Sequence, residues 1–67
     1  MKEFEIVIAT RDLENGLVKA GQEGAIVDVH VNPEGYEVDF EVGDGWEVVT
    51  CYPADITPKY AEVRKTA

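Results

Sequence analysis

The stretch GYEVDFEVGDGWEVVTCY, residues 35–52, decides the fold because it reads as two β-strands joined by a tight turn. Apolar and acidic residues alternate through 36–42, and a second run rich in valine and aromatic residues fills 46–52. Alternation with a period of two is typical of a strand that has one buried face. The glycines of Gly43-Asp44-Gly45 allow the chain to reverse between the runs. The stretch therefore predicts an antiparallel hairpin with one carboxylate-rich face.

Two further strands are expected on the N-terminal side of this hairpin. Residues 4–9 and 24–31 are rich in β-branched residues, and residues 11–22 between them have the glycine and asparagine content of a long loop. Three apolar residues of this loop are expected to anchor it beneath the sheet: Leu13, Leu17 and Val18.

The C-terminal part completes an all-β pattern. Residues 53–56, Pro-Ala-Asp-Ile, predict one turn of 3-10 helix, and 57–63 predict a short fifth strand. Five short antiparallel strands with a long first loop and a 3-10 turn before the last strand predict a small, partly open SH3-like barrel. We expect one such domain over residues 1–63, followed by a flexible tail at 64–67.

The expected turn lengths predict a strand register. A four-residue turn at 32–35 would pair Val31 with Tyr36, and a three-residue turn at 43–45 would pair Val42 with Trp46. The core face would then contain the following residues: Ala25, Val27, Val29, Val31, Tyr36, Val38, Phe40, Val42, Trp46, Val48 and Thr50. In this register Trp46 and Tyr36 point inward and cap the core.

The opposite face would gather carboxylates, in two pairs of like charge: Asp28 facing Asp39, and Glu41 facing Glu47. Like charges directly opposite one another destabilise a sheet, so their clustering favours a docking face for a basic partner. The predicted face consists of Asp28, Glu37, Asp39, Glu41 and Glu47. The alternative is that these carboxylates are solvated, screened by salt, and only keep the protein soluble.

Size and charge exclude several classes of function. The chain has 67 residues, with 14 acidic and 6 basic ones, so its net charge is −8. Binding to nucleic-acid phosphates or to an anionic membrane needs lysine and arginine, so neither is expected. A domain of this size buries only about 60% of its unfolded surface, which leaves little room for a deep catalytic pocket.

The single cysteine, Cys51, cannot form an intramolecular disulfide. The N-terminal residues lack the pattern of a signal peptide, and no apolar run approaches the ~20 residues that cross a bilayer. We therefore expect a cytoplasmic protein in a reducing compartment.

One row of the predicted sheet, His30, Glu37 and Cys51, invites a catalytic or metal-binding interpretation. His30 and Cys51 would lie about 9.6 Å apart on strands two positions from each other. A nucleophile and its base need about 3 Å, and the close ligand pairs of zinc motifs are absent. His30 is more simply a partner of Glu37. We predict no catalytic residue, no metal ligand and no cofactor.

Several segments together resemble a known family. They are Asp12-Leu13, then GLVKAGQEGAIV at 16–27, then YEVDF at 36–40, followed by a glycine-containing turn and a strand that ends in Pro-Ala-Asp-Ile. This pattern resembles a family of short bacterial proteins known only as domain of unknown function 4926. The resemblance covers about residues 5–56, and the chain departs from it at Ala25 and at Tyr52-Pro53. It implies an SH3-like barrel and carries over no catalytic residue.

A weaker similarity, through Gly21-x-x-Gly24-x-x-Val27, is to the KOW motif of transcription and ribosomal proteins. It leaves open a nucleic-acid or ribosome-associated module whose contacts come from the first loop and the basic C-terminus. The loop residues that would make these contacts are Arg11, Asp12, Glu14 and Lys19. A metal-binding or enzyme accessory protein using His30 and Cys51 is a further alternative.

The function that these observations favour is a non-enzymatic interaction module that docks a basic protein on its acidic face. Neutralisation of a toxin or nuclease would fit this chemistry, as would the role of an accessory subunit. The protein is expected to be a monomer, or a weak homodimer that forms through an exposed edge strand.

Overall fold

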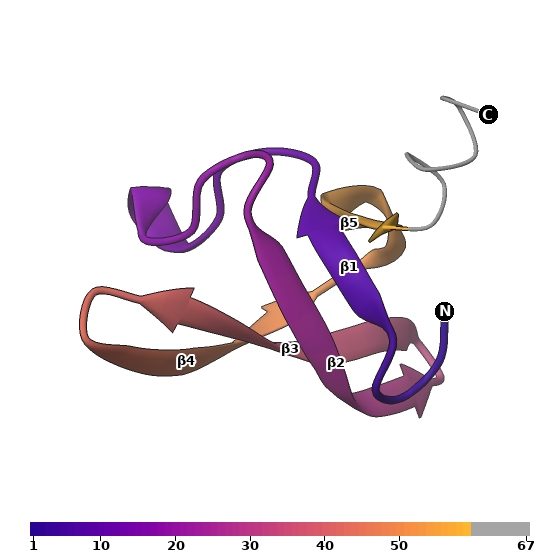
Figure 1. The fold of residues 1–67 in the computed structure, drawn as a ribbon. Helices are drawn as coiled ribbons and strands as arrows, with labels where there is room; N and C mark the ends of the chain where they lie inside the picture. Colours follow the sequence, from indigo (N-terminus) through magenta and orange to yellow (C-terminus); the bar gives the residue numbers. More distant parts are fainter. Residues whose placement is uncertain (60–67) are drawn as a thin grey trace, which may run out of the picture.

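The computed structural model describes residues 1–59, and residues 60–67 lie outside the described part. Five strands and two 3-10 turns follow one another along the chain (Figure 1). They are β1 (Ile6–Ala9), η1 (Glu14–Gly16), β2 (Glu23–Val31), β3 (Glu34–Val42), β4 (Gly45–Cys51), η2 (Pro53–Asp55) and β5 (Ile56–Pro58).

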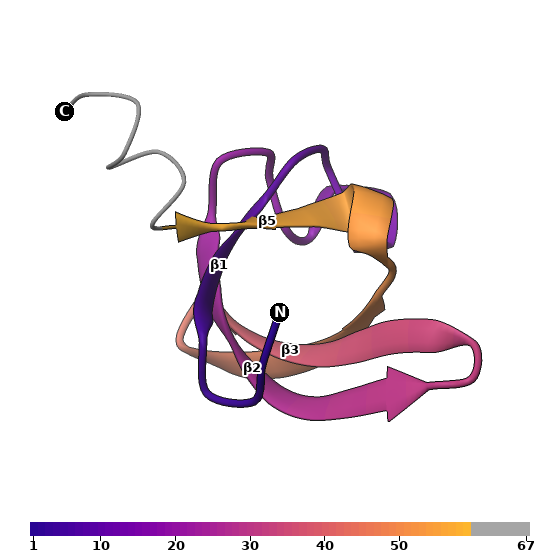
Figure 2. The same ribbon diagram turned by 90° about the vertical axis from the view of Figure 1, so that its right-hand side faces the viewer.

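The strands form one antiparallel sheet in the order β4-β3-β2-β1-β5. The all-β fold, the long first loop and the 3-10 turn before the last strand are confirmed. Figure 2 shows how the sheet curls: β1 runs along one side, and β5 lies across from β2 and β3. β5 spans only Ile56–Pro58, and the rest of the strand expected at 57–63 falls partly outside the described residues, as do the expected domain boundary and tail.

The core lies on the inner face of this curled sheet. Alternate residues of β3 point inward, and β4 contributes Val49 and Cys51. The buried apolar residues are Val7, Ile8, Ala9, Leu13, Val18, Ile26, Tyr36, Val38, Phe40, Val49, Cys51 and Ile56. Period-two alternation therefore buries one set of β3 side chains and exposes the acidic set between them.

The first loop closes one side of the core with two of its three expected anchors. Leu13 and Val18 are buried and form an isolated bridge, with Leu13 donating to the Val18 carbonyl at 2.8 Å. The expectation for Leu17 was wrong, because its side chain remains 48% exposed. Gly16, the last residue of η1, has a φ of +91°, a left-handed conformation after which Leu17 points outward and Val18 returns to the core.

Both hairpin turns are shorter than expected. Glu34 lies opposite Val31, and Gly45 lies opposite Val42, so each turn has two residues. The expected pairs Val31–Tyr36 and Val42–Trp46 were therefore wrong. At the second turn Gly43 adopts φ of +54°, a left-handed conformation that glycine allows and that two-residue hairpin turns commonly use at their first position.

The shorter second turn reverses the two faces of β4. Val49 lies opposite Val38 and Cys51 opposite Tyr36, so both are buried. Trp46 and Val48 point outward instead of capping the core. A one-residue change in register moves every side chain of a strand to the other face, which is the physical reason for this correction.

A β-bulge changes the register of β2 as well. Ile26 lies opposite Val38 and Asp28 opposite Glu37, which leaves Val27 without a partner. Ile26 enters the core in its place, while Val27 and Val31 are exposed. The predicted core residues that the structure places inside are Tyr36, Val38 and Phe40, with Val29 and Val42 packed at the border. The prediction was wrong for Ala25, Val27, Val31, Trp46, Val48 and Thr50.

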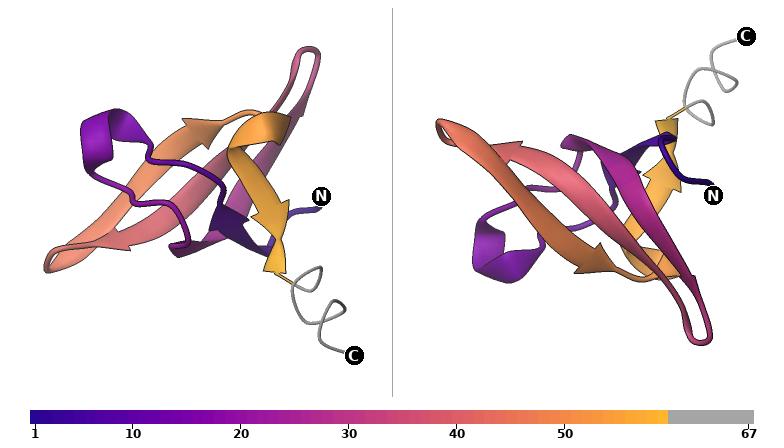
Figure 3. Two further views of the ribbon diagram at one scale, coloured as in Figure 1. Left: turned by 90° about the horizontal axis from the view of Figure 1, so that it is seen from above. Right: turned by 90° about the horizontal axis from the view of Figure 1, so that it is seen from below.

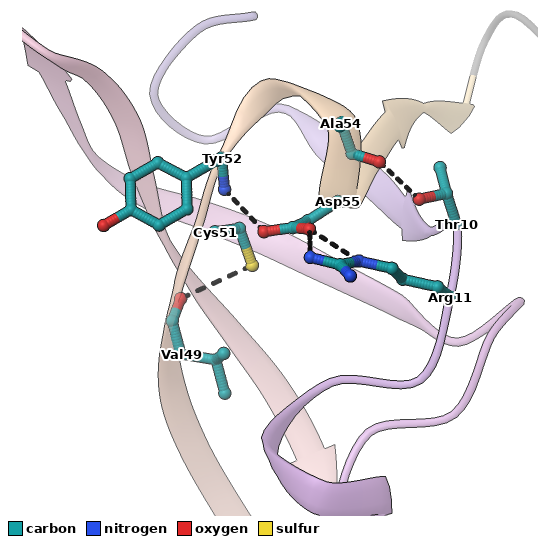
Figure 4. Close-up of polar contacts among 7 residues, drawn as sticks. All are labelled: Thr10, Arg11, Val49, Cys51, Tyr52, Ala54 and Asp55. Carbon is teal, nitrogen blue, oxygen red and sulfur yellow. Dashed lines mark hydrogen bonds and ion pairs between the residues drawn. The ribbon is translucent and has the colours of Figure 1, made fainter.

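A polar cluster ties the first loop to η2 (Figure 4). Arg11 donates from Nε and Nη2 to Oδ1 of Asp55 at 2.8 and 2.5 Å, and Tyr52 N–H donates to Oδ2 at 2.9 Å. Thr10 Oγ1 donates to the Ala54 carbonyl at 2.7 Å. Asp55 is only 4% exposed, so the hydrogen bonds from Arg11 and Tyr52 satisfy a buried carboxylate where the chain crosses from β4 to β5.

Candidate functional site

The candidate site is the outer face of the β2–β4 meander, which lies in front of the rest of the fold when seen from below (Figure 3, right). Because Tyr36, Val38 and Phe40 point inward, the residues between them in β3 point outward. Four carboxylates share this face, and we call them the acidic face: Asp28, Glu37, Asp39 and Glu41.

Glu47 does not belong to the acidic face, contrary to the prediction. It lies opposite Phe40 and so is on the other side of β4, although it is exposed. The expected like-charge pairs change too, because Asp28 lies opposite Glu37, and Glu41 lies opposite Trp46. The structure therefore brings together four of the five predicted residues and separates one.

Most basic residues of the described part form ion pairs with carboxylates outside the acidic face. Arg11 contacts Asp55, and Lys59 Nζ lies 2.8 Å from Glu23 Oε2. Within residues 1–59, Asp28, Asp39 and Glu41 have no lysine, arginine or histidine within ion-pair distance. The acidic face thus keeps an uncompensated negative charge among the described residues.

Glu37 is the one member of the acidic face with a polar network. Its carboxylate lies 3.0 Å from Nε2 of His30 and accepts hydrogen bonds from Thr50 Oγ1 at 2.9 and 3.1 Å. The expected partnership of His30 with Glu37 is confirmed. A carboxylate held on two sides is fixed in position, whereas Asp39 and Glu41 beside it have no such restraint in the described part.

Cys51 lies on the opposite face of the sheet from His30, so the predicted row His30, Glu37 and Cys51 was wrong. The thiol is fully buried and donates to the Val49 carbonyl, with Sγ 3.6 Å from the oxygen. Burial, reinforced by the negative charges of Asp55, Glu37 and Glu14, raises the pKa of Cys51 to about 11. A protonated, inaccessible thiol can act neither as a nucleophile nor as a metal ligand.

The four loop residues named for the nucleic-acid alternative are not part of the acidic face. Lys19 Nζ lies 3.8 Å from Asp12, whose other oxygen accepts a hydrogen bond from Ala20 N–H. Arg11 is held by Asp55, and Glu14 is exposed at η1. The two basic side chains of this loop thus already face carboxylates of the chain itself.

Residues 1–59 hold no cluster of three or more histidine, cysteine, aspartate or glutamate side chains arranged to bind a metal ion. The described residues also include no helix with the length and apolar composition needed to cross a membrane.

Trp46 is a prominent site residue that the sequence interpretation misplaced. Its side chain is 64% exposed and lies opposite Glu41 on the outer face. With Ile6, Ala25, Glu23, Gly24 and Glu41 it lines a shallow hollow of about 230 Å³. The sequence does contain a signal for this position. The dipeptide Gly43-Asp44 is typical of a two-residue hairpin turn, and a turn of that length places Trp46 on the outer face.

Comparison with known proteins identifies a family. No curated protein and no solved structure matches the chain. The model of the family described as Domain of unknown function (DUF4926) matches residues 3–58, which is most of the sequence. The expected family resemblance is thereby confirmed, and the chain belongs to the DUF4926 family.

Proposed function

We propose that this protein is a non-enzymatic interaction module that docks a basic protein through its acidic face. The observation that carries the proposal is the position of Asp28, Glu37, Asp39 and Glu41 on adjacent strands, three of them without a basic partner in residues 1–59. Asp28 and Glu37 lie directly opposite each other, an arrangement that weakens a sheet. A basic partner would convert this repulsion into favourable contacts.

The charge of the whole chain supports the same kind of partner. A net charge of −8 on 67 residues attracts cations from beyond the contact surface and raises the association rate. Nucleic acid is a poor partner for such a surface, because phosphate contacts need free lysine and arginine. In the first loop both basic side chains face carboxylates of the chain itself.

We further propose that the module works in the cytoplasm, as a monomer or as a weak homodimer that forms through the edge strand β4. Its role would be to neutralise a basic toxin or nuclease, or to act as an acidic accessory subunit. β4 supports the dimer because it is an edge of the sheet and contains neither lysine nor proline, which usually protect such edges.

A capture experiment with two charge-matched variants tests the docking proposal. The acidic-face variant carries Asp28→Asn, Asp39→Asn and Glu41→Gln, and the control variant carries Glu3→Gln, Asp44→Asn and Glu47→Gln. Each variant removes three of the 14 acidic charges, so both change the net charge from −8 to −5. Glu47 is a sharp control because it lies on the same strand pair but on the opposite face.

Immobilised wild type and variants would be incubated with a lysate of the native host, and the retained proteins identified by mass spectrometry. We expect a basic protein that the wild type and the control variant hold and that the acidic-face variant loses, with release at high salt. Equal loss from both variants would mean that only net charge matters. Equal retention by all three proteins would overturn the proposal.

A further inference from the structure

The outer face has an apolar part beside the carboxylates. In one row across the sheet Ile6 lies opposite Ala25, Ala25 opposite Asp39, and Asp39 opposite Val48. Trp46 lies beside this row, opposite Glu41. Ile6, Trp46 and Val48 are all among the exposed large apolar residues. A domain of this size has a small core and can leave few large apolar residues outside it.

The hollow that Ile6 and Trp46 help to line has about the size of one side chain. Its volume of about 230 Å³ is smaller than the roughly 300–1,000 Å³ of sites for whole small molecules. Ile6 and Trp46 supply its apolar lining, and Glu23 and Glu41 supply its carboxylates. Gln22 Nε2 donates to the backbone carbonyl of Glu41 and so holds this part of β3 in place.

The chemistry of this lining selects a cation with an apolar stem. A purely apolar occupant would remove water from Glu41 without replacing its hydrogen bonds, which is unfavourable. The guanidinium group of arginine stacks on an aromatic ring and donates paired hydrogen bonds to a carboxylate. Lys59 already contacts Glu23 at 2.8 Å, which leaves Glu41 as the carboxylate for an incoming group.

We propose that the hollow between Trp46 and Glu41 receives an arginine side chain of the basic partner, stacked on the indole ring and hydrogen-bonded to Glu41. This inference rests on the proposed function and names the feature of the partner that is recognised. Charge complementarity favours this occupant over a second copy of the chain, which would bring its own carboxylates to the same surface.

Three peptides that differ in one chemical feature test the inference. They are Ac-GRVRVRG-NH₂, the same peptide with lysine in place of arginine, and the same peptide with citrulline, which has the shape of arginine without its charge. Trp46 is the only tryptophan, so its fluorescence reports directly on the hollow. Calorimetric titration gives the affinities for variants that lack this signal.

For the wild type we expect the arginine peptide to bind at least about threefold more tightly than the lysine peptide, and to change the fluorescence of Trp46. Citrulline should reduce binding about tenfold or more. Trp46→Leu should abolish the preference for arginine over lysine, and Glu41→Gln should weaken binding of the arginine peptide. Glu47→Gln, on the opposite face, should change neither.

Equal affinity of the wild type for the arginine and lysine peptides would overturn the arginine site but leave the acidic docking face standing, as would a preference that survives Trp46→Leu. The comparison of the arginine and lysine peptides uses the wild type alone, so it remains a valid test even if a variant fails to fold. Binding of no cationic peptide at millimolar concentration would overturn both proposals. An affinity for the arginine peptide that falls as the protein concentration is raised would mean that a second copy fills the hollow, and it would overturn the arginine site. A fluorescence change with protein concentration alone is also expected from a dimer through β4, which contains Trp46.

Discussion

Arg11 and Asp55 form a charged contact between the first loop and the turn that precedes β5, with Nη2 of Arg11 2.5 Å from Oδ1 of Asp55. The two residues are 44 positions apart, and the aspartate is buried whereas the arginine is largely exposed. Asp55 also accepts a hydrogen bond from the N–H of Tyr52, the N-cap residue directly before η2. The contacts of Asp55 therefore join the first loop to the segment where the chain crosses from β4 to β5.

Replacing Asp55 with alanine should destabilise the fold by about 2 kcal/mol, because the change removes charge-assisted hydrogen bonds and leaves Tyr52 N–H without a partner. For a domain of this size that loss corresponds to a decrease in melting temperature of about 8–16 °C. Thermal unfolding followed by circular dichroism measures it. Asp12→Asn is the control, since its 3.8 Å ion pair with Lys19 is exposed and should contribute little. Equal melting temperatures for the two variants would contradict a structural role for Asp55.

The same carboxylate should make stability sensitive to acid. Burial alone would raise the pKa of Asp55, but the Tyr52 N–H and the Arg11 guanidinium outweigh that effect and lower it. Its contribution to stability is therefore complete above the unfolded pKa of about 3.9, and it is lost as the pH falls through the folded pKa. In urea unfolding between pH 7 and pH 2, the stability difference between wild type and Asp55→Asn should shrink only below about pH 4. A difference independent of pH would exclude this linkage.

Gly24 is required by the packing of the core beneath β2. A Cβ atom at this position would lie 2.7 Å from side-chain atoms of Phe40 and Val38, both fully buried. We expect Gly24→Ala to cost about 1–3 kcal/mol through overpacking. Gly45→Ala is the matched control, because its Cβ atom would meet nothing within 4 Å. Indistinguishable urea midpoints for the two variants would show that the core relaxes freely around residue 24.

Two adjacent valines in β4 test which face of the strand is buried. Val49 is 3% exposed and Val48 is 53% exposed, so Val49→Ala should cost about 2 kcal/mol and Val48→Ala less than about 1 kcal/mol. Chemical denaturation of both variants measures the difference. The opposite order would mean that the second hairpin has a three-residue turn and that Trp46 is buried.

Cys51 should be inert in the folded protein. Its burial and its pKa of about 11 keep the thiol protonated and shielded near neutral pH. We expect iodoacetamide at pH 8 to modify the native protein far more slowly than the same protein in 6 M guanidinium chloride, as measured by intact mass. Modification at equal rates under the two conditions would mean that the thiol is accessible.

The acidic face could be predicted in large part because β3 is locally unambiguous. In this strand three apolar residues alternate with three carboxylates: Tyr36, Val38 and Phe40 with Glu37, Asp39 and Glu41. Burying the unpaired carboxylates would cost much free energy, whereas burying the apolar side chains is favourable. β4 has no such contrast, because each of its two faces would present apolar side chains. The position of Glu47 and Trp46 therefore depended on the length of the preceding turn, which was predicted one residue too long.

The sequence by itself determined the number and order of the strands, the excess of negative charge and the acidic side of β3, since these follow from composition and from contacts between close neighbours. Tertiary structure alone decided two further features. The β-bulge at Val27 placed Ile26 in the core, and Arg11 met Asp55 across 44 positions. Each depends on how the sheet curls around one shared core, and that curvature is a property of all the strands together.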